Sequence, residues 1–205
     1  LLHPVVANDL INFASLLKET NRLSESEPLI RQALAISESA YGPSHPDVAT
    51  GVNYLAKFFE ETNRLVEAEP LMRRVLSIYE SSYGPIHPAV AGSLSNLAML
   101  LETGKRLSEA EPLLRRGLSI SMLSLGKDNP DVARDLNNLA TLLQDTGRLV
   151  EAESLMRRAL SICETSYGPD HTDVATVLNN LARLFQSTNR LSGAEPLMRR
   201  HVEIF

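Results

Sequence analysis

Residues 129–170 read NPDVARDLNNLATLLQDTGRLVEAESLMRRALSICETSYGPD, and the same pattern recurs along the whole chain every 42 residues. His-Pro or a variant of it stands at the start of each repeat, at His3, His45, His87, Asn129 and His171. Self-similarity at a fixed period of this length is typical of a repeat architecture. The period predicts a single array over residues 1–205, with repeats at approximately 3–44, 45–86, 87–128, 129–170 and 171–205.

Each repeat contains two apolar stripes with helical spacing. In the fourth, Val132, Leu136, Leu139 and Leu143 fall on one face of a first helix. A second stripe runs from Ala152 to residue 162. Neither helix can bury its stripe alone, so neighbouring repeats must stack into a continuous core. The sequence therefore predicts an all-α solenoid of about ten antiparallel helices, each about 16 residues long and about 24 Å in length.

Residues that begin and end helices recur in phase. Gly147 and Gly104 are predicted to take a left-handed conformation after the first helix, with Asn21, Asn63 and Asn189 in that role elsewhere. Ser-x-x-Glu predicts a capping box at the start of the second helix in three repeats, at Ser24, Ser108 and Ser192. Tyr-Gly-Pro predicts its end at Tyr41, Tyr83 and Tyr167. Glu and Arg four residues apart predict an ion pair on each second helix, as in Glu153 and Arg157.

Composition narrows the class of protein. The net charge of −5 gives no general attraction to nucleic acid or to an anionic membrane, and we expect neither as a partner. No apolar run reaches the roughly 18 residues needed to span a bilayer, and Cys163 is the only cysteine. We therefore expect a cytoplasmic setting. Because the chain starts at Leu1 and the pattern stops within a repeat, we expect a fragment of a longer protein.

No residue pattern indicates catalysis, a metal or a cofactor. The histidines of the His-Pro positions are one repeat apart, too far to share a metal, and we interpret them as residues at helix starts. Cys163 is interpreted as a half-buried, inert thiol. The paired arginines of the second helices, such as Arg157 and Arg158, have glutamates nearby and are interpreted as a solvated, ion-paired face. We expect no enzymatic activity.

The chain resembles the tetratricopeptide repeat family, in the 42-residue form found in kinesin light chains. The resemblance rests on the small residues of the first helix (Ala14, Ala56, Ala98, Ala140 and Ala182) and of the second (Ser26, Ala68, Ala110, Ala152 and Ala194). A later small position reads Ala33, Val75, Gly117, Ala159 and then His201, which departs from the pattern. The resemblance implies a right-handed superhelix that binds proteins.

In this family the first helices line a concave groove where partners dock. The resemblance places one residue per repeat in that groove: Asn12, Tyr54, Asn96, Asn138 and Asn180. Beside them lie Asn53, Ser95, Asn137 and Asn179. Side-chain amides offer donors and acceptors to the backbone of an extended peptide, although they also suit a role in setting the stacking of helices. Arg134 and Arg183 add a weak preference for acidic stretches, without the concentrated basic clamp of some family members.

The function expected from these residues is a scaffold that binds a partner protein or extended peptide in the groove. The alternative is a spacer or oligomerisation module that acts through its ends or convex face. Apolar residues at both ends (Leu1, Leu2, Val202, Ile204 and Phe205) make end-to-end self-association of the fragment an expectation of that alternative.

Overall fold

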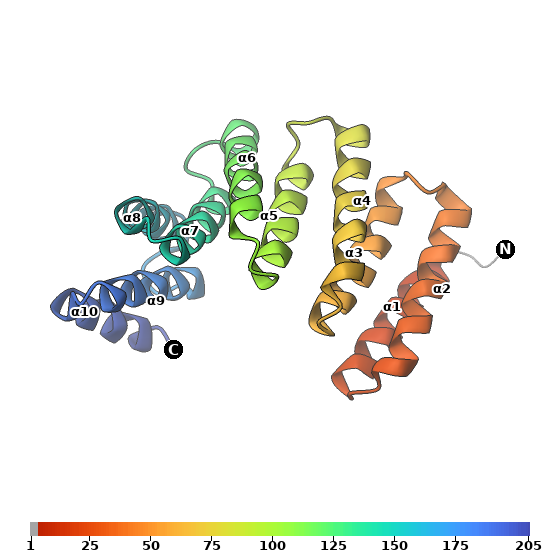
Figure 1. Ribbon diagram of the computed structural model, residues 1–205, viewed down its shortest axis with the longest axis horizontal. Helices are drawn as coiled ribbons and strands as arrows, with labels where there is room; N and C mark the ends of the chain where they lie inside the picture. Colours follow the sequence, from red (N-terminus) through yellow and green to blue (C-terminus); the bar gives the residue numbers. More distant parts are fainter. Residues whose placement is uncertain (1–3) are drawn as a thin grey trace. The chain divides into compact units, whose positions relative to one another are not determined.

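The structure, a computed structural model, describes residues 4–205 and has ten α-helices and no strand in that range (Figure 1). The helices are α1 (Pro4–Glu19), α2 (Leu23–Tyr41), α3 (Pro46–Glu61), α4 (Leu65–Tyr83), α5 (Pro88–Thr103), α6 (Leu107–Leu125), α7 (Pro130–Asp145), α8 (Leu149–Tyr167), α9 (Thr172–Ser187) and α10 (Leu191–Glu203). Odd-numbered helices are the first of each repeat and even-numbered helices the second. The predicted all-α helical repeat fold is confirmed. Leu1, Leu2 and His3 lie outside the described residues.

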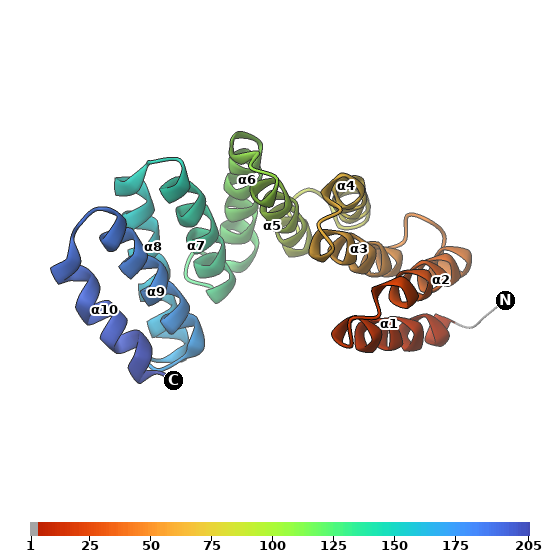
Figure 2. The ribbon, with the colours of Figure 1, turned by 60° about the horizontal axis from the view of Figure 1, so that its bottom comes forward.

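The chain divides into two compact units. The first ends at Gly104 and contains α1 to α5, and the second, Lys105–Phe205, contains α6 to α10. Within each unit every helix packs against the next along the chain. In the second unit α7 also contacts α9 directly, and Figure 2 shows α7 to α10 side by side. The boundary falls between the two helices of the third repeat, whereas the single array over residues 1–205 stays a prediction.

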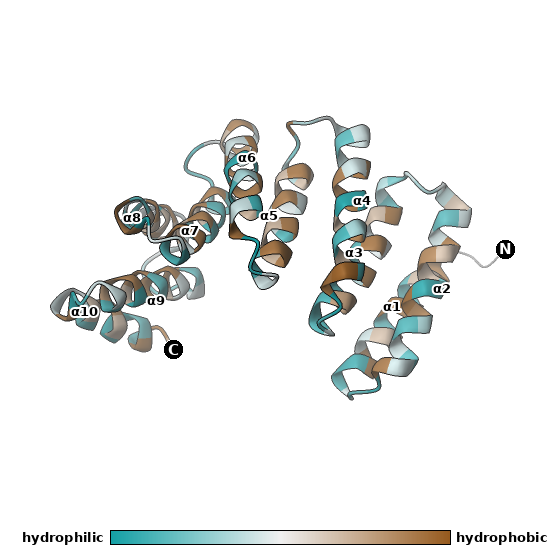
Figure 3. Cartoon of the chain, in the orientation of Figure 1, coloured by the Kyte–Doolittle hydropathy of each residue, from teal (hydrophilic) through white to brown (hydrophobic). Residues whose placement is uncertain are grey.

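Small residues allow the helices of a repeat to approach closely. Ala56, Ala98, Ala140 and Ala182 of the first helices are fully buried, as are Ala68, Ala110 and Ala152 of the second helices. In the first repeat Ser26 takes the alanine position and its hydroxyl donates to the carbonyl oxygen of Ala14 at 2.8 Å. Hydrophobic and hydrophilic residues alternate along the helices, as Figure 3 shows. The core is therefore a series of Leu, Val and Ala layers between consecutive helices.

The His-Pro positions begin the first helices, as predicted. The Nδ1 atoms of His45, His87 and His171 accept from the backbone N–H two residues later at 3.2 Å. Asn129 does the same through its side-chain oxygen at 2.8 Å. Each of these histidines also stacks on the tyrosine that ends the preceding helix, with ring centroids 4.3 Å apart for Tyr167 and His171. The histidine thus joins the end of one repeat to the start of the next.

In one repeat the sequence predicts the wrong residue for the left-handed position after the first helix. Asn21, Asn63, Gly147 and Asn189 have the expected positive φ, but Gly104 has a φ of −77°. In that repeat Lys105 takes the left-handed conformation, with a φ of 61°. The 42-residue period explains the difference, because the residue equivalent to Gly147 in this repeat is Lys105 and not Gly104. A lysine therefore holds a conformation that costs residues with a Cβ about 1–2 kcal/mol.

The predicted capping boxes are wrong. The second helices begin two residues earlier than Ser-x-x-Glu implies, at Leu23, Leu107 and Leu191, so the serines lie inside the first turn. The N-cap position belongs to an arginine without a side-chain capping bond, as at Arg22. That guanidinium instead binds the glutamate three residues later, with Arg22 Nη2 at 2.6 Å from Glu25 Oε2.

On α2, α6 and α8 one glutamate binds arginines from two repeats. The predicted pairs with the arginine four residues later form throughout, as for Glu27 and Arg31. The same carboxylates also accept from the N-cap arginine of the next repeat, in the pairs Glu27–Arg64, Glu111–Arg148 and Glu153–Arg190. The hydrogen bond from Arg190, followed by that from Arg157, lowers the pKa of Glu153 despite partial burial.

An aromatic ring supports this arginine in two repeats. The guanidinium of Arg64 lies 4.2 Å from the ring centroid of Phe59, and that of Arg190 lies 4.0 Å from the centroid of Phe185. A cation held over an aromatic face and bound to a carboxylate loses little further freedom. The cluster of glutamate, arginine and ring therefore fixes the register between adjacent repeats.

We predict that Lys105→Gly stabilises the chain by about 1 kcal/mol, because glycine adopts a positive φ without a steric cost. The melting temperature should rise by roughly 2–4 °C in a thermal unfolding experiment. Lys105→Ala is the control, since it removes the same charge but keeps a Cβ. An equal rise in both variants would show that the charge, and not the backbone, is responsible.

We also predict that Glu153→Gln costs about 1 kcal/mol of stability at pH 7 and less at pH 3. The pKa of Glu153 is lowered in the folded state, so its contribution is present above the unfolded carboxyl pKa of about 4.3 and is lost as the pH falls through the folded value. Denaturant unfolding at both pH values measures this difference. Glu195→Gln is the matched control, because Glu195 pairs with Arg199 and has no later repeat beside it. If Glu195→Gln lowers the free energy of unfolding as much as Glu153→Gln does, the role given to the Arg190 bond is contradicted.

Candidate peptide-binding surfaces

The residues predicted to bind a peptide lie on the odd-numbered helices. We call their surface the first-helix face and describe it separately for each unit. In the first unit Asn12 and Tyr54 are exposed, while Asn53 and Asn96 are half-buried. In the second unit Arg134 and Arg183 are exposed, Asn138, Asn179 and Asn180 are half-buried, and Asn137 is buried.

In the first unit an ion pair crosses between neighbouring first helices. Lys18 Nζ of α1 lies 2.7 Å from Glu61 Oε2 of α3. Beneath this pair is a cavity of about 60 Å³ that Tyr54 also lines. The pocket is too small for more than a fragment of a side chain. The face of this unit is therefore shallow at this point, and Lys18 and Glu61 neutralise each other there.

The second unit brings two predicted residues into direct contact. Asn180 of α9 donates from Nδ2 to Oδ1 of Asn137 on α7, at 3.1 Å. The two residues are 43 positions apart, the same separation as between Lys18 and Glu61. First helices of adjacent repeats thus meet with an offset of one residue beyond the period. The bond uses one donor of Asn180 and one acceptor lone pair of Asn137. Because each carboxamide has two donors and two acceptor lone pairs, this bond does not use up the hydrogen-bonding capacity of either side chain.

A pocket of about 140 Å³ opens beside the amide pair. It lies between α7, the end of α8 and the start of α9, and its lining includes both Arg134 and Asn137. Ala133, Val177, Cys163 and Tyr167 supply less polar surface, and Asp131, Asp173 and Thr176 supply polar groups. A cavity of similar size, about 150 Å³, holds a benzene ring. The pocket therefore has room for one aliphatic or small aromatic side chain.

The charges around this pocket offset one another. Arg134 Nη2 lies 3.0 Å from Asp131 Oδ1, so part of its positive charge is already paired. The carboxylate of Asp173 lines the same pocket, and Asp173 Oδ2 lies 3.6 Å from Nδ1 of His171. In the first unit burial raises the pKa of Glu60, although nearby Lys57 opposes the shift. The surface suits an uncharged peptide backbone better than a run of one charge.

The sequence did not single out Asp173, Thr176 or Tyr167 as part of a site. Thr176 precedes Asn180 by one helical turn, so a search along the same helix face would have found it. Tyr167 belongs to the Tyr-Gly-Pro motif and was assigned only to ending α8. Cys163 is buried and not half-buried, and burial, with smaller contributions from Asp173 and Glu164, raises the pKa of its thiol. The thiol is therefore protonated and unreactive at neutral pH.

Asp135 is an unexpected polar residue in the core of the second unit. It is buried, and its Oδ2 accepts from the hydroxyl of Ser121 on α6 at 2.6 Å. At the next junction the equivalent positions are Val177 and Cys163, which are apolar. The chemistry of the two junctions therefore differs, and a repeat cannot stack equally well on any other.

Residues 4–205 contain neither a membrane-spanning helix nor a cluster of metal-binding side chains. None of the helices in that range is long and apolar enough to cross a membrane. The same range contains no group of three or more His, Cys, Asp or Glu side chains placed to hold a metal ion.

The repeat sequence and the helix pairs together define a class of helical repeat protein. The sequence profile of the tetratricopeptide repeat matches residues 5–81, 48–122 and 131–205. These matches cover most of the chain, which therefore belongs to the tetratricopeptide repeat family. Proteins of this family bind partner proteins or peptides, and the chain is a protein-interaction scaffold. A comparison with curated proteins gives no match.

Several solved structures share the fold. One is a kinesin light chain from Podospora anserina with nearly identical TPR-like repeats (TM-score 0.81, 22% identity, 100% of this chain and 97% of that one). Another is BtubC (BKLC) from P. vanneervenii (TM-score 0.84, 22% identity, 98% and 80%). The apo form of RapI is also similar (TM-score 0.78, 14% identity, 100% and 55%). The likeness confirms the kinesin-light-chain type of repeat fold.

Proposed function

We propose that the first-helix face of the second unit binds an extended segment of a partner protein. The backbone of the segment lies along the amides of α7 and α9, and one aliphatic or small aromatic side chain enters the pocket beside Asn137. The observation that carries the proposal is the hydrogen bond between Asn180 and Asn137, next to a pocket of about 140 Å³. That bond orients both amides before any partner arrives, so less conformational freedom is lost on binding.

The charges around the pocket indicate the kind of segment. Arg134 is paired with Asp131, and Asp173 is nearby, so an acidic segment gains little from Arg134. Arg183 is exposed on α9 and remains the better contact for a carboxylate. We therefore expect a mostly uncharged segment, with at most a modest preference for an acidic residue near Arg183. The same face in the first unit, with Asn12, Asn53, Tyr54 and Asn96, would extend the surface for a longer partner.

The test uses random peptides of about 12 residues displayed on phage, selected on the intact 205-residue chain. The affinity of selected peptides is then measured for Asn138→Ala/Asn180→Ala. Loss of two peptide hydrogen bonds should raise Kd by roughly 10- to 30-fold. The melting temperature should fall by only a few degrees, because neither asparagine is fully buried and the main loss is the bond from Asn180 to Asn137.

The matched control is Ser154→Ala/Ser161→Ala, which removes two exposed polar groups from α8, the second helix of the fourth repeat. We expect its Kd to lie within about twofold of the wild type. Equal binding by the asparagine variant and the control contradicts the proposal. So does a large loss of stability with unchanged affinity, which would assign the amides to helix stacking alone.

A further inference from the structure

One position on the second helices differs in size from repeat to repeat. In α8 it is Cys163, which lines the pocket of about 140 Å³ in the second unit. One repeat earlier it is Ser121, whose hydroxyl donates to the buried carboxylate of Asp135 at 2.6 Å, so that these two side chains fill their junction. Two repeats earlier it is Tyr79 of α4. The same place in the fold thus has a phenol ring in one repeat and a small thiol in another.

In the first unit Tyr79 belongs to a stack of three rings. Its ring lies 5.8 Å from that of Tyr83 between centroids, and Tyr83 stacks in turn on His87 at 4.4 Å. Tyr79 is half-buried and forms a hydrogen bond with Thr50 of α3. Burial raises the pKa of the Tyr79 phenol, and the bond with Thr50 opposes that shift. The junction between α3, α4 and α5 therefore accommodates an uncharged phenol.

The second unit has the same stack without its first ring. Tyr167, the equivalent of Tyr83, stacks on His171 with ring centroids 4.3 Å apart. Tyr167 also lines the pocket, together with Cys163, which stands where the first unit has Tyr79. The pocket therefore opens at the place that a third ring would take.

The hydrogen-bonding group at the far end of the ring is also present. Arg134 of α7 is the equivalent of Thr50 and lines the pocket. Its Nη2 lies 3.0 Å from Asp131 Oδ1, but a guanidinium has several N–H donors, and others remain for a phenol oxygen. Both groups that hold Tyr79 in the first unit thus have counterparts around the empty space in the second.

Larger residues on α9 leave this space open. Thr176 and Val177 stand where the first unit has Gly92 and Ser93. A Cβ at Gly92 would meet nothing within 4 Å, so a side chain at this position need not touch the ring of Tyr79. The remaining volume of about 140 Å³ is close to that of a cavity of about 150 Å³ that holds a benzene ring.

We propose that the pocket beside Asn137 binds a tyrosine side chain of the partner segment, with its ring stacked on Tyr167 and its hydroxyl bonded to Arg134. This inference rests on the proposed function, which supplies the segment, and it adds the residue that the segment carries. The tyrosine of the partner takes the place at the junction of α7, α8 and α9 that Tyr79 takes at the junction of α3, α4 and α5.

The polar groups of the pocket distinguish tyrosine from related side chains. A phenylalanine fills the same volume but offers no oxygen to Arg134. A phosphotyrosine brings about two negative charges next to the carboxylates of Asp131 and Asp173, which both line the pocket. The pocket therefore favours the uncharged phenol over both.

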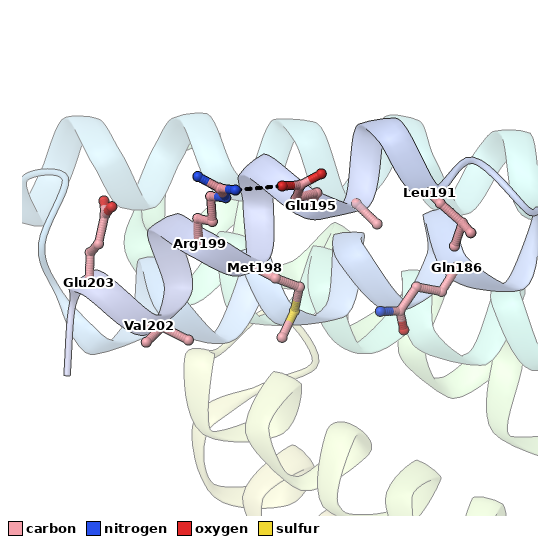
Figure 4. A pocket seen from close by; sticks show the side chains of 8 residues that line it. Gln186, Leu191, Glu195, Met198, Arg199, Val202 and Glu203 are labelled. Carbon is pink, nitrogen blue, oxygen red and sulfur yellow. Dashed lines mark hydrogen bonds and ion pairs between the residues drawn. The ribbon is translucent and has the colours of Figure 1, made fainter.

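A wider groove of about 720 Å³ lies along α10, where Leu191, Met198 and Val202 are apolar (Figure 4). Glu195 and Arg199 form an ion pair in its lining. The described residues that line this groove include no aromatic ring. Of the two spaces, the pocket beside Asn137 is therefore the one that offers a tyrosine a stacking partner.

The test uses N-acetyl-tyrosinamide, a single capped tyrosine, so that it depends on no partner segment. NMR follows the methyl signals of Ala133 and Val177, which line the pocket, as the capped residue is added to the 205-residue chain. The signals should shift to saturation, with a Kd on the order of 1 mM for a ligand of this size. N-acetyl-phenylalaninamide should bind about 3- to 10-fold more weakly because it lacks the hydroxyl. The capped phosphotyrosine should bind at least about tenfold more weakly.

Variants at the equivalent positions test the place of binding. Cys163→Tyr should fill the pocket from within and abolish the shifts. Ser161→Tyr is the matched control, because it adds the same residue at an exposed position of α8, and its Kd should stay within about twofold of the wild type. Tyr79→Cys should open the equivalent space in the first unit, so that the methyl signal of Ala49, the equivalent of Ala133, shifts as well.

A variant of an exposed side chain tests the hydroxyl contact without affecting the core. The side chain of Arg134 is 62% exposed, so Arg134→Ala should keep the fold, as circular dichroism melting would show. This variant should reduce the preference for capped tyrosine over capped phenylalanine to less than about twofold.

Methyl signals that do not shift in the wild type overturn the proposal. Equal binding of capped tyrosine and capped phenylalanine, or shifts that persist in a folded Cys163→Tyr variant, also contradict it. Peptides selected on phage that need Asn138 and Asn180 but contain no tyrosine would support the proposed function and contradict this inference alone. Capped tyrosine that binds while no peptide is selected would support the tyrosine pocket and contradict the binding of an extended segment.

Discussion

A helix pair of this sequence cannot bury its apolar residues by itself, and the rest of the structure depends on that constraint. Leu136, Leu139 and Leu143 of α7 are buried only because α6, α8 and α9 surround them. Alanines where the helices meet permit close packing, and the cluster of glutamate, arginine and phenylalanine sets the register from one repeat to the next.

The role that we propose for the first-helix face, partner binding, is different from the stacking of the repeats. Most of its polar residues are not needed to satisfy the core, because the backbone of each helix is satisfied within the helix. Asn137 and Asn180 are the informative case, since they bind each other across adjacent repeats and lie next to a pocket. At this pair a contact between adjacent repeats and the proposed binding surface therefore coincide.

Most of the fold could be predicted from the sequence, because helix starts, helix ends and apolar stripes are local and repeat in phase. The errors have equally local causes. Gly104 was preferred to Lys105 because glycine usually takes a positive φ, although the period assigned that position to the lysine. The capping boxes failed because an arginine, as at Arg22, Arg106 and Arg190, takes the N-cap position and leaves the serine inside the helix.

The candidate site was less predictable, because it depends on contacts between repeats. The offset that brings Asn137 to Asn180 is a property of helix packing and cannot be seen in one repeat. The second bond of Glu153, to Arg190, was missed for the same reason. Likewise, the sequence of one repeat does not explain why Asp135 is buried, because its hydrogen-bond partner is Ser121 of the preceding helix.

The most direct test of the account is an NMR titration of the side-chain amide signals, in which a peptide selected by the intact chain is added to it. The account predicts that the side-chain NH₂ signals of Asn137, Asn138 and Asn180 shift in proportion to occupancy, while the guanidinium signals of Arg157 and Arg199 on the second helices do not. Unchanged asparagine signals with shifts confined to the second helices would contradict it.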